Sequence, residues 1–300
     1  MALRRTIGCL VGVVALWLGS VLLSVAPAAV DDEAAAIAQL RTVLCDRFRQ
    51  SALAGARKQI EANHFLSREK KAIFVRFSER LLNETQVIPV MVDTLVATYG
   101  SKLLGTASQE LQAQMINQVG TIYGKIGAAG LTYLSDRERR LVLSQQMEVM
   151  GRLAPQDCVL YANAQVTLDS IAKNATATGA FLQTMSNQEV QAILDAQLNT
   201  MSLGALHQAK PRRMTRAQYE EMQKLTGEAI VDWMLSFAPE DQERFAQFLW
   251  GDASKLSVDD ACAINISLNQ MALEAEGNTG ELVRLAMMLG FFEEDELVSD

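Results

Sequence analysis

Histidine is scarce in this sequence, and its scarcity limits the chemistry that the chain can support. The 300 residues include two histidines, His64 and His207. Histidine is the usual general base and metal ligand at neutral pH. Neither residue has a carboxylate or a thiol at ligand spacing, and there is no H-E-x-x-H motif. Both fall where a helix is expected to end, and a cation there meets the negative end of the helix dipole. We therefore expect no metal and no cofactor.

The sequence also lacks the common catalytic signatures. It contains no G-x-S-x-G motif, no P-loop and no dinucleotide-binding fingerprint. Ser67 and Lys70 match S-x-x-K, but the companion motifs S-D-N and K-T-G are missing, and Ser67 can be explained as a helix cap. Carboxylates are plentiful, for example Glu220 and Glu221. Two carboxylates about 5–9.5 Å apart can cleave glycosides. A helical hydrolase with paired carboxylates therefore remains an alternative.

Clusters of basic residues are absent as well. The formal net charge is −8, and it becomes −10 without residues 1–28, which hold two arginines and no acid. Positive charge occurs only in short pairs, such as Lys70-Lys71 and Arg139-Arg140. This composition argues against binding to nucleic acid or to anionic lipid through charge.

The N-terminus has the pattern of an export signal. Arg4 and Arg5 precede an uncharged apolar run, Ile7 to Val25, and Ala26-Pro27-Ala28 offers a cleavage site. We expect residues 1–28 to be a signal peptide of a protein exported to the bacterial periplasm. The apolar run is also just long enough to stay as an uncleaved anchor in the inner membrane, with the rest of the chain facing the periplasm.

Helical periodicity dominates the rest of the chain, and no run of β-branched residues alternates with polar ones. An apolar residue followed by a cap recurs as a helix-start signature, and in four of the five cases an acid or amide lies three positions after the cap. The capping positions are Ser67, Ser135, Ser186, Thr215 and Ser257. The sequence predicts an all-α bundle of about nine to eleven helices, with the acidic tail 293–300 expected to fray.

Two stretches of the chain resemble each other. Residues 108–163 and 211–266 share apolar positions about 103 apart, with Gly124 over Gly227. We interpret this as a diverged duplication of a three-helix unit, although capped amphipathic helices resemble one another in any case. The expected organisation is an N-terminal half, 29–176, and a C-terminal half, 177–300, which meet near Thr176 to Gly179.

Cysteine is too rare for a disulfide scaffold, so the core must carry the fold. Three cysteines follow the signal: Cys45, Cys158 and Cys262. Export favours one disulfide and one remaining thiol. Cys158 and Cys262 occupy matching places in the two units, so they are the favoured pair. The alternative is three buried thiols, which pack well in apolar interiors.

Four glycines cluster in the helix expected from residue 108 to about 133: Gly120, Gly124, Gly127 and Gly130. Each costs a helix about 1 kcal/mol relative to alanine, so the cluster needs a reason. Close approach by a neighbouring helix is the favoured explanation. A partner surface, a membrane contact and the wall of a cavity for an apolar ligand are alternatives. The stretch is too short to span a bilayer.

Two apolar segments are candidates for recognition, although large apolar side chains are usually core. One contains Phe248 and Trp250, and the other ends in Phe291 and Phe292. The preferred hypothesis is an exported, non-enzymatic protein that binds a protein partner, as an assembly factor, inhibitor or immunity-type protein does. The first alternative is a binder of lipid or another apolar ligand in a cavity between helices.

Overall fold

The computed structural model describes residues 33–64, 66–103, 109–163, 168–251, 255–290 and 292–299. This part of the chain is almost entirely helical, which confirms the all-α prediction. It contains thirteen helices, somewhat more than predicted, and two short strands. Within these ranges, none of the helices combines the length and the hydropathy needed to cross a bilayer. The predicted signal, residues 1–28, lies outside the described residues.

The elements follow one another along the chain as α2 (Glu33–Ala62), α3 (Arg68–Glu84), α4 (Val87–Leu103), α5 (Gln109–Leu131), α6 (Asp136–Met150), α7 (Pro155–Ala162), α8 (Leu168–Gln183), α9 (Asn187–Leu206), β1 (Met214–Thr215), α10 (Arg216–Leu235), α11 (Pro239–Trp250), α12 (Val258–Glu274), α13 (Gly277–Leu289), α14 (Glu294–Leu297) and β2 (Val298–Ser299). All five predicted caps precede helices and accept a backbone N–H from the first turn. The cap signature therefore located these helix starts correctly.

The helices form two compact units. Among the described residues, unit 1 comprises 131–185 and 211–299, and unit 2 comprises 33–130 and 186–210. The described chain begins in unit 2, enters unit 1 at Leu131, returns to unit 2 for α9, and then goes back to unit 1. The expected seam at Thr176 to Gly179 lies inside α8, and the division into an N-terminal and a C-terminal half stays a prediction. The internal duplication stays a prediction.

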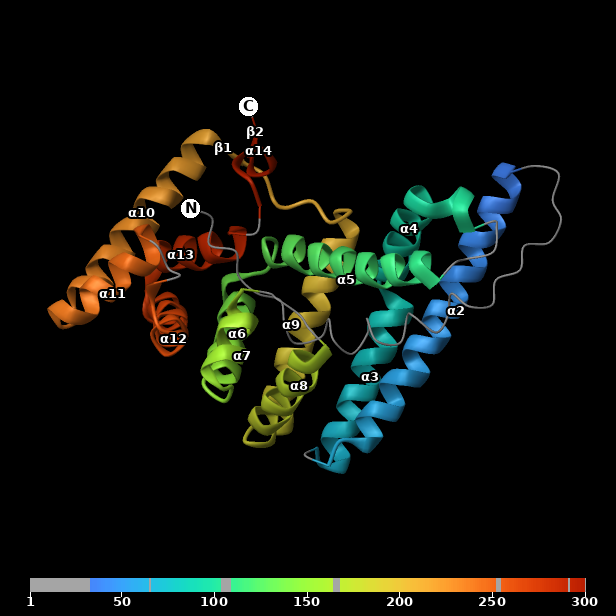
Figure 1. Ribbon diagram of the computed structural model, residues 1–300, viewed down its shortest axis with the longest axis horizontal. Coiled ribbons are helices and arrows are strands. Elements are labelled where there is room, and N and C mark those ends of the chain that lie inside the picture. The colour runs from blue at the N-terminus through green and yellow to red at the C-terminus, as the bar shows by residue number, and fades with distance from the viewer. Residues whose placement is uncertain are drawn as a thin grey trace. The chain divides into compact units, whose positions relative to one another are not determined.

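Unit 2 is built on the long helix α2, with α3 beside it (Figure 1). The apolar stripe of α2 is buried along its whole length: Leu40, Leu44, Phe48, Ala52, Ala56 and Ile60. Phe77 and Leu81 of α3 are buried as well. Helix α9 packs against α3, and Arg80 donates to Asp195 across this contact at 2.8 Å. Burial of these faces provides the main driving force for the unit, since exposed ion pairs add little.

Unit 1 is fixed by two arginines that hold the end of α12. The Arg284 side chain is 1% exposed and donates to both oxygens of Asp136, at 2.6 and 2.9 Å. Its remaining terminal nitrogen donates to the carbonyls of Ala272 and Ala275. Arg140 also donates to Ala275 and to Asp136. The last carbonyls of a helix lack partners within it, so this network satisfies the end of α12 while joining it to α6 and α13.

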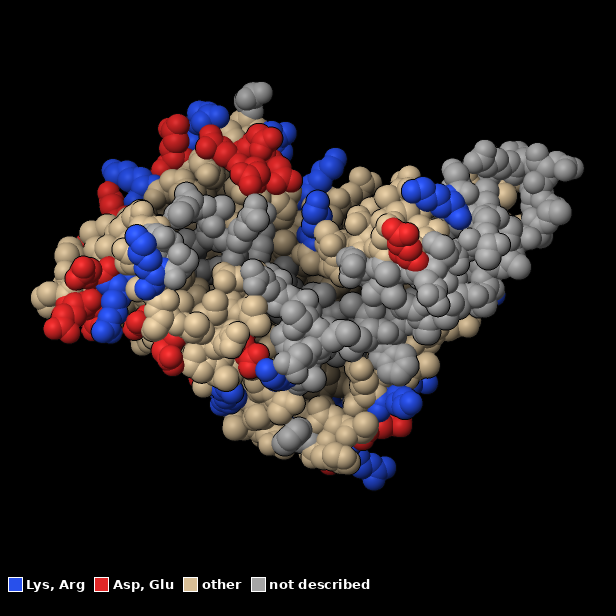
Figure 2. Space-filling view, in the orientation of Figure 1, with Lys and Arg blue, Asp and Glu red and all other residues tan. Residues whose placement is uncertain are grey.

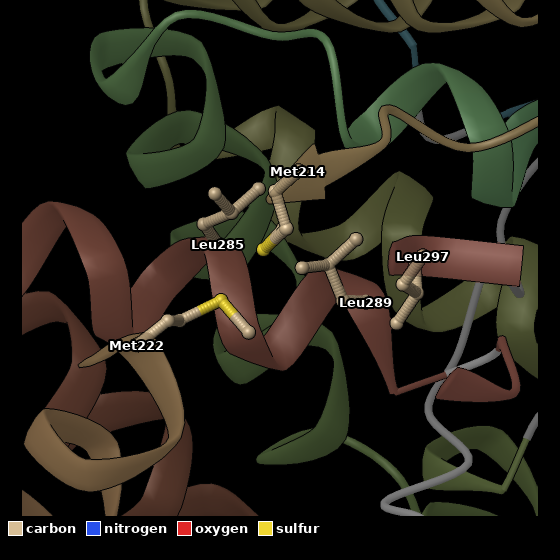
Figure 3. Close-up of a cluster of buried hydrophobic side chains, with 5 residues drawn as sticks. All are labelled: Met214, Met222, Leu285, Leu289 and Leu297. Atoms are coloured by element: carbon tan, nitrogen blue, oxygen red, sulfur yellow. The ribbon is translucent and has the colours of Figure 1, made fainter. Parts of the chain in front are cut away.

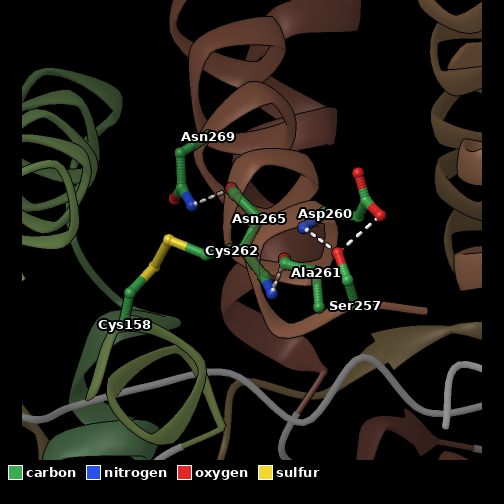
Figure 4. The surroundings of a disulfide bond; sticks show 7 residues. All are labelled: Cys158, Ser257, Asp260, Ala261, Cys262, Asn265 and Asn269. Atoms are coloured by element: carbon green, nitrogen blue, oxygen red, sulfur yellow. Dashed lines mark hydrogen bonds between the residues drawn. A yellow bond between two sulfur atoms is a disulfide. The ribbon is translucent and has the colours of Figure 1, made fainter. Parts of the chain in front are cut away.

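A disulfide links α7 to α12, as the matching positions of the two cysteines predicted. The Cα atoms of Cys158 and Cys262 are 5.7 Å apart, and both residues are buried (Figure 4). In α12 the amides of Asn265 and Asn269 each donate to the carbonyl four residues earlier, so these buried polar groups are satisfied within the helix. Cys45 in unit 2 is a half-buried free thiol.

Residues 293–299 of the acidic tail are ordered, so the expectation that this segment frays is wrong. After α14, Val298 pairs with Met214 in a two-residue parallel ladder between β2 and β1. Ser299 donates its hydroxyl to the carbonyl of Met214. Leu297 is 3% exposed because it joins a buried cluster whose side chains point toward one another (Figure 3). The other members of the cluster are Met214, Met222, Leu285 and Leu289. The burial of Leu297 and the pairing of β2 with β1 therefore hold the tail against unit 1, although its negative charge alone would favour exposure to solvent.

Candidate functional site

Unit 1 contains an open pocket of about 440 Å³ between α10, α11, α12 and α13, with the tail as a further wall. This volume lies within the range of about 300–1,000 Å³ that is typical of ligand sites. Leu289 and Leu297 belong both to the pocket wall and to the cluster of Figure 3. The pocket is therefore a continuation of the apolar core of unit 1 to the surface.

One wall of the pocket is α10, a helix of 20 residues of which only Met222 is buried. Tyr219, Gln223, Gly227 and Ile230 line the pocket at helical spacing, so one face of α10 looks into it. A Cβ atom placed on Gly227 would meet nothing within 4 Å. The glycine thus widens the pocket without serving the packing of the helix.

Three large apolar side chains of α10 and α11 are exposed, and one of them lines the pocket. Trp250, which lines the pocket, is 59% exposed. Val231 follows the lining residue Ile230 and is 37% exposed, and Leu235 is 59% exposed. Single exposed aliphatic residues such as Val231 and Leu235 need no explanation, but an exposed tryptophan that lines a pocket is typical of a binding surface.

The corner between α10 and α11 is held by stacked aromatic rings. Trp233 meets Phe237 edge to face, with ring centroids 5.6 Å apart, and Phe237 stacks on Phe245 at 5.0 Å. The indole N–H of Trp233 donates to the hydroxyl of Ser267 on α12 at 3.1 Å. These contacts fix the wall that carries Trp250, so the exposed indole is attached to a rigid element.

Acidic residues border the pocket at the end formed by the tail. Glu293 and Glu294 line it, and Glu294 pairs with Arg216 at 2.9 Å in a largely exposed ion pair. Burial of the Tyr219 phenol raises its pKa, and the nearby Glu294 carboxylate raises it further. Tyr219 therefore remains a neutral hydrogen-bonding group at the pocket. Figure 2 shows the acids gathered over α14.

The net negative charge of the whole chain is concentrated in the segment that builds the pocket. Residues 211–300 contain 7 Lys and Arg against 18 Asp and Glu, a net charge of −11. The preceding 210 residues contain 20 and 17, a net charge of +3. The pocket thus lies in a strongly negative part of the molecule, which raises the local concentration of cations and of cationic partners.

The apolar segments expected to serve recognition are only partly at this site. Trp250 and Phe292 both line the pocket, whereas Phe248 is half-buried and is absent from its lining. Phe291 lies outside the described residues. The sequence did not predict the lining face of α10, which mixes polar, aromatic, aliphatic and glycine positions.

The glycines at the two ends of the glycine-rich segment of α5 have different surroundings. At Gly130 an added Cβ atom would lie 1.7 Å from the carbonyl oxygen of Thr200 in α9. At Gly204 of α9 it would lie 1.8 Å from the carbonyl oxygen of Ile126 in α5. The two backbones thus approach closely at this crossing, as predicted for the cluster as a whole. Gly127 is buried.

Gly120 and Gly124 face open space, since an added Cβ atom would have no neighbour within 4 Å. Close approach therefore does not explain these two residues, and a role for them in a surface stays a prediction.

Comparison with known proteins adds no identification. Neither a protein-family model, nor a curated protein, nor a solved structure matches this chain. Any proposal about its role must therefore stand on the pocket itself.

Proposed function

We propose that this chain is an exported binding protein of the bacterial periplasm, and that it docks a protein partner at the pocket of unit 1. The observation that carries the proposal is the exposed Trp250 at the mouth of an open, apolar pocket. Tryptophan at the edge of a pocket is typical of the few residues that dominate binding between proteins. The Cys158–Cys262 disulfide is compatible with an oxidising compartment.

The openness of the site favours a protein over an isolated apolar ligand. An apolar ligand gains most from a cavity that covers nearly all of its surface. Here Trp250 lines the pocket and is 59% exposed, so a small ligand in the pocket would leave much of its indole in water. A partner with an extended surface would cover the pocket and this indole together.

Photo-crosslinking in the native host tests the proposal. The full chain carries a photoreactive phenylalanine at position 231, beside the pocket, or at the exposed position 58 of α2 as a control. We expect defined protein adducts only when the photoreactive residue is at position 231. These adducts should be lost when Gly227→Trp fills the pocket. The same adducts from both positions would contradict the proposal. A bound apolar molecule in native mass spectra that Gly227→Trp displaces would support the ligand alternative instead.

A further inference from the structure

We propose that the partner segment that enters this pocket carries an apolar side chain and, about two to four residues away, a lysine or an arginine. The inference rests on the proposed function. The apolar side chain would occupy one end of the pocket, and the ammonium or guanidinium group would occupy the other. The basis is the way in which polarity changes along α10, the helix that forms one wall.

The pocket follows one face of α10. Tyr219, Thr226 and Ile230 all line it. Thr226 and Ile230 lie seven and eleven positions after Tyr219, so both are within about 20° of it around the helix axis. At a rise of about 1.5 Å per residue, Tyr219 and Ile230 are about 16 Å apart along the helix. The pocket therefore suits an elongated ligand that lies along α10.

The C-terminal part of α10 forms the apolar end of the pocket. There the indole N–H of Trp233 donates to the hydroxyl of Ser267 at 3.1 Å, which holds α12 beside this part of α10. The next residue of α12, Leu268, lines the pocket and is 1% exposed. Ile230 lines the same end from α10. An apolar side chain placed here would exchange water for contact with buried hydrocarbon.

The first turn of α10 forms the acidic end. Arg216 pairs with Glu294 at 2.9 Å, which places the tail beside this turn. Glu293, Glu294 and Phe292 line the pocket from the tail. Burial raises the pKa of the Tyr219 phenol, and the Glu294 carboxylate raises it further, so these two groups lie close together. Two carboxylates and one arginine leave this end negative beside two aromatic rings, and both features attract an ammonium or guanidinium group.

Between the two ends lies a hydroxyl group that lacks a hydrogen-bond partner. Oγ1 of Thr226 is buried, and within the described part of the chain nothing donates to it or accepts from it. Buried polar groups are nearly always paired, so a ligand that pairs with this hydroxyl would account for it. A peptide has backbone amides between two of its side chains, whereas a hydrocarbon or a simple amine has no polar group there.

These features together select a short peptide segment over other ligands. An anionic ligand would be repelled by the net charge of −11 over residues 211–300. A wholly apolar ligand would leave the acidic end without a countercharge, and none of the described residues that line the pocket is Lys or Arg. An extended chain advances about 3.3 Å per residue and a basic side chain adds further reach, so the proposed spacing spans both ends.

Nuclear magnetic resonance titrations with short peptides test the inference on residues 29–300. The indole N–H resonance of Trp250, which lines the pocket, reports binding. The probe is a capped hexapeptide with one leucine and one arginine three positions apart and serine elsewhere. One control has citrulline in place of arginine, which keeps the shape and removes the charge. A second control has serine in place of leucine.

We expect the arginine peptide to bind about fivefold more tightly than the citrulline peptide at low salt, and this ratio to shrink as salt is added. The peptide without leucine should bind about tenfold more weakly than the probe, because it leaves the apolar end in water.

Two double variants with equal loss of charge locate the basic side chain. Glu293→Gln with Glu294→Gln removes two acids that line the pocket, and Glu240→Gln with Glu243→Gln removes two exposed acids at the start of α11. The first should abolish the preference for arginine over citrulline, and the second should keep it, because both lower the overall charge equally.

Thr226→Val removes the hydroxyl and nearly keeps the shape of the side chain. We expect the arginine and citrulline peptides to bind this variant about threefold more weakly, and Thr226→Ser to keep the affinity of the natural chain. The urea midpoint of Thr226→Val should be unchanged or higher, because no hydrogen bond within the described chain is lost. A general loss of stability would lower it instead.

The results separate this inference from the proposed function. Equal binding of the arginine and citrulline peptides, or a preference that persists without Glu293 and Glu294, would overturn the basic anchor. Phenylbutylamine is the probe for a free organic cation, and binding as tight as that of the arginine peptide would overturn the peptide assignment. If no peptide binds while the crosslinks from position 231 still depend on the pocket, the inference falls and the proposed function stands. If neither peptides nor crosslinks report on the pocket, both are wrong.

Discussion

The close contact between α5 and α9 leads to a specific prediction. Alanine substitution of two glycines in α5, Gly124 and Gly130, should change the stability of the protein in opposite directions. At Gly130 the new Cβ atom would sit 1.7 Å from the Thr200 oxygen, whereas a Cβ atom in contact with another atom essentially never lies closer than 3.0 Å. Backbone must therefore move by more than an ångström. At Gly124 the same atom meets nothing within 4 Å.

The magnitudes follow from two competing effects. Alanine favours a helix over glycine by about 1 kcal/mol. Overpacking costs about 1–3 kcal/mol, and the upper end applies here because the obstacle is backbone. We expect Gly124→Ala to stabilise unit 2 by about 0.5–1 kcal/mol and Gly130→Ala to destabilise it by about 2 kcal/mol. The gap between the two variants should be near 3 kcal/mol.

Urea unfolding followed by far-ultraviolet circular dichroism measures the difference. Hydrogen exchange of α9 peptides then shows whether the loss is local to the crossing. Gly204→Ala should be as costly as Gly130→Ala, since its Cβ atom would lie 1.8 Å from the Ile126 oxygen. The two changes combined should cost less than their sum because they open the same contact. A neutral or stabilising Gly130→Ala would refute the close approach.

Three further predictions concern unit 1. Asp136→Asn should cost about 2–4 kcal/mol at neutral pH, measured by urea unfolding, because it leaves Arg284 buried without its carboxylate. Burial raises the pKa of Asp136, but hydrogen bonds from its arginine partners outweigh burial and leave the pKa below its ordinary value. This contribution is present above the unfolded-state pKa of about 4 and is lost as the pH falls through the lowered value, so the variant should have a flatter acid profile. Replacing Cys158 and Cys262 by alanine should cost about 3–5 kcal/mol in thermal and urea unfolding, since the disulfide spans 104 residues; a cost below 1 kcal/mol would contradict a native disulfide. Trp250→Ala should change stability by less than about 0.5 kcal/mol, because its side chain is mostly in water, while abolishing the crosslinks from Val231.

The residues near each helix start determined most of the secondary structure. Ser135 and Glu138 form a reciprocal capping box within four residues, so the start of α6 could be read directly from the sequence. The apolar stripe of α2 is a local pattern of the same kind, because a buried face repeats every three to four residues along a helix. The disulfide was predictable as well, since Cys158 and Cys262 occupy matching places in the two similar stretches, 108–163 and 211–266.

Tertiary structure alone decided the pocket, the crossing and the fate of the tail. Gly124 and Gly130 look alike in sequence, yet only Gly130 meets another helix, because that depends on where α9 returns in the chain. The tail is held by Leu297 and by pairing with Met214, a contact across more than 80 residues that no local pattern encodes. Local propensity and caps act within a few residues, whereas pockets arise from the packing of distant helices. The sequence by itself therefore determined a capped helical protein and favoured one pairing of its cysteines, and only the packing of distant helices decided where the pocket lies.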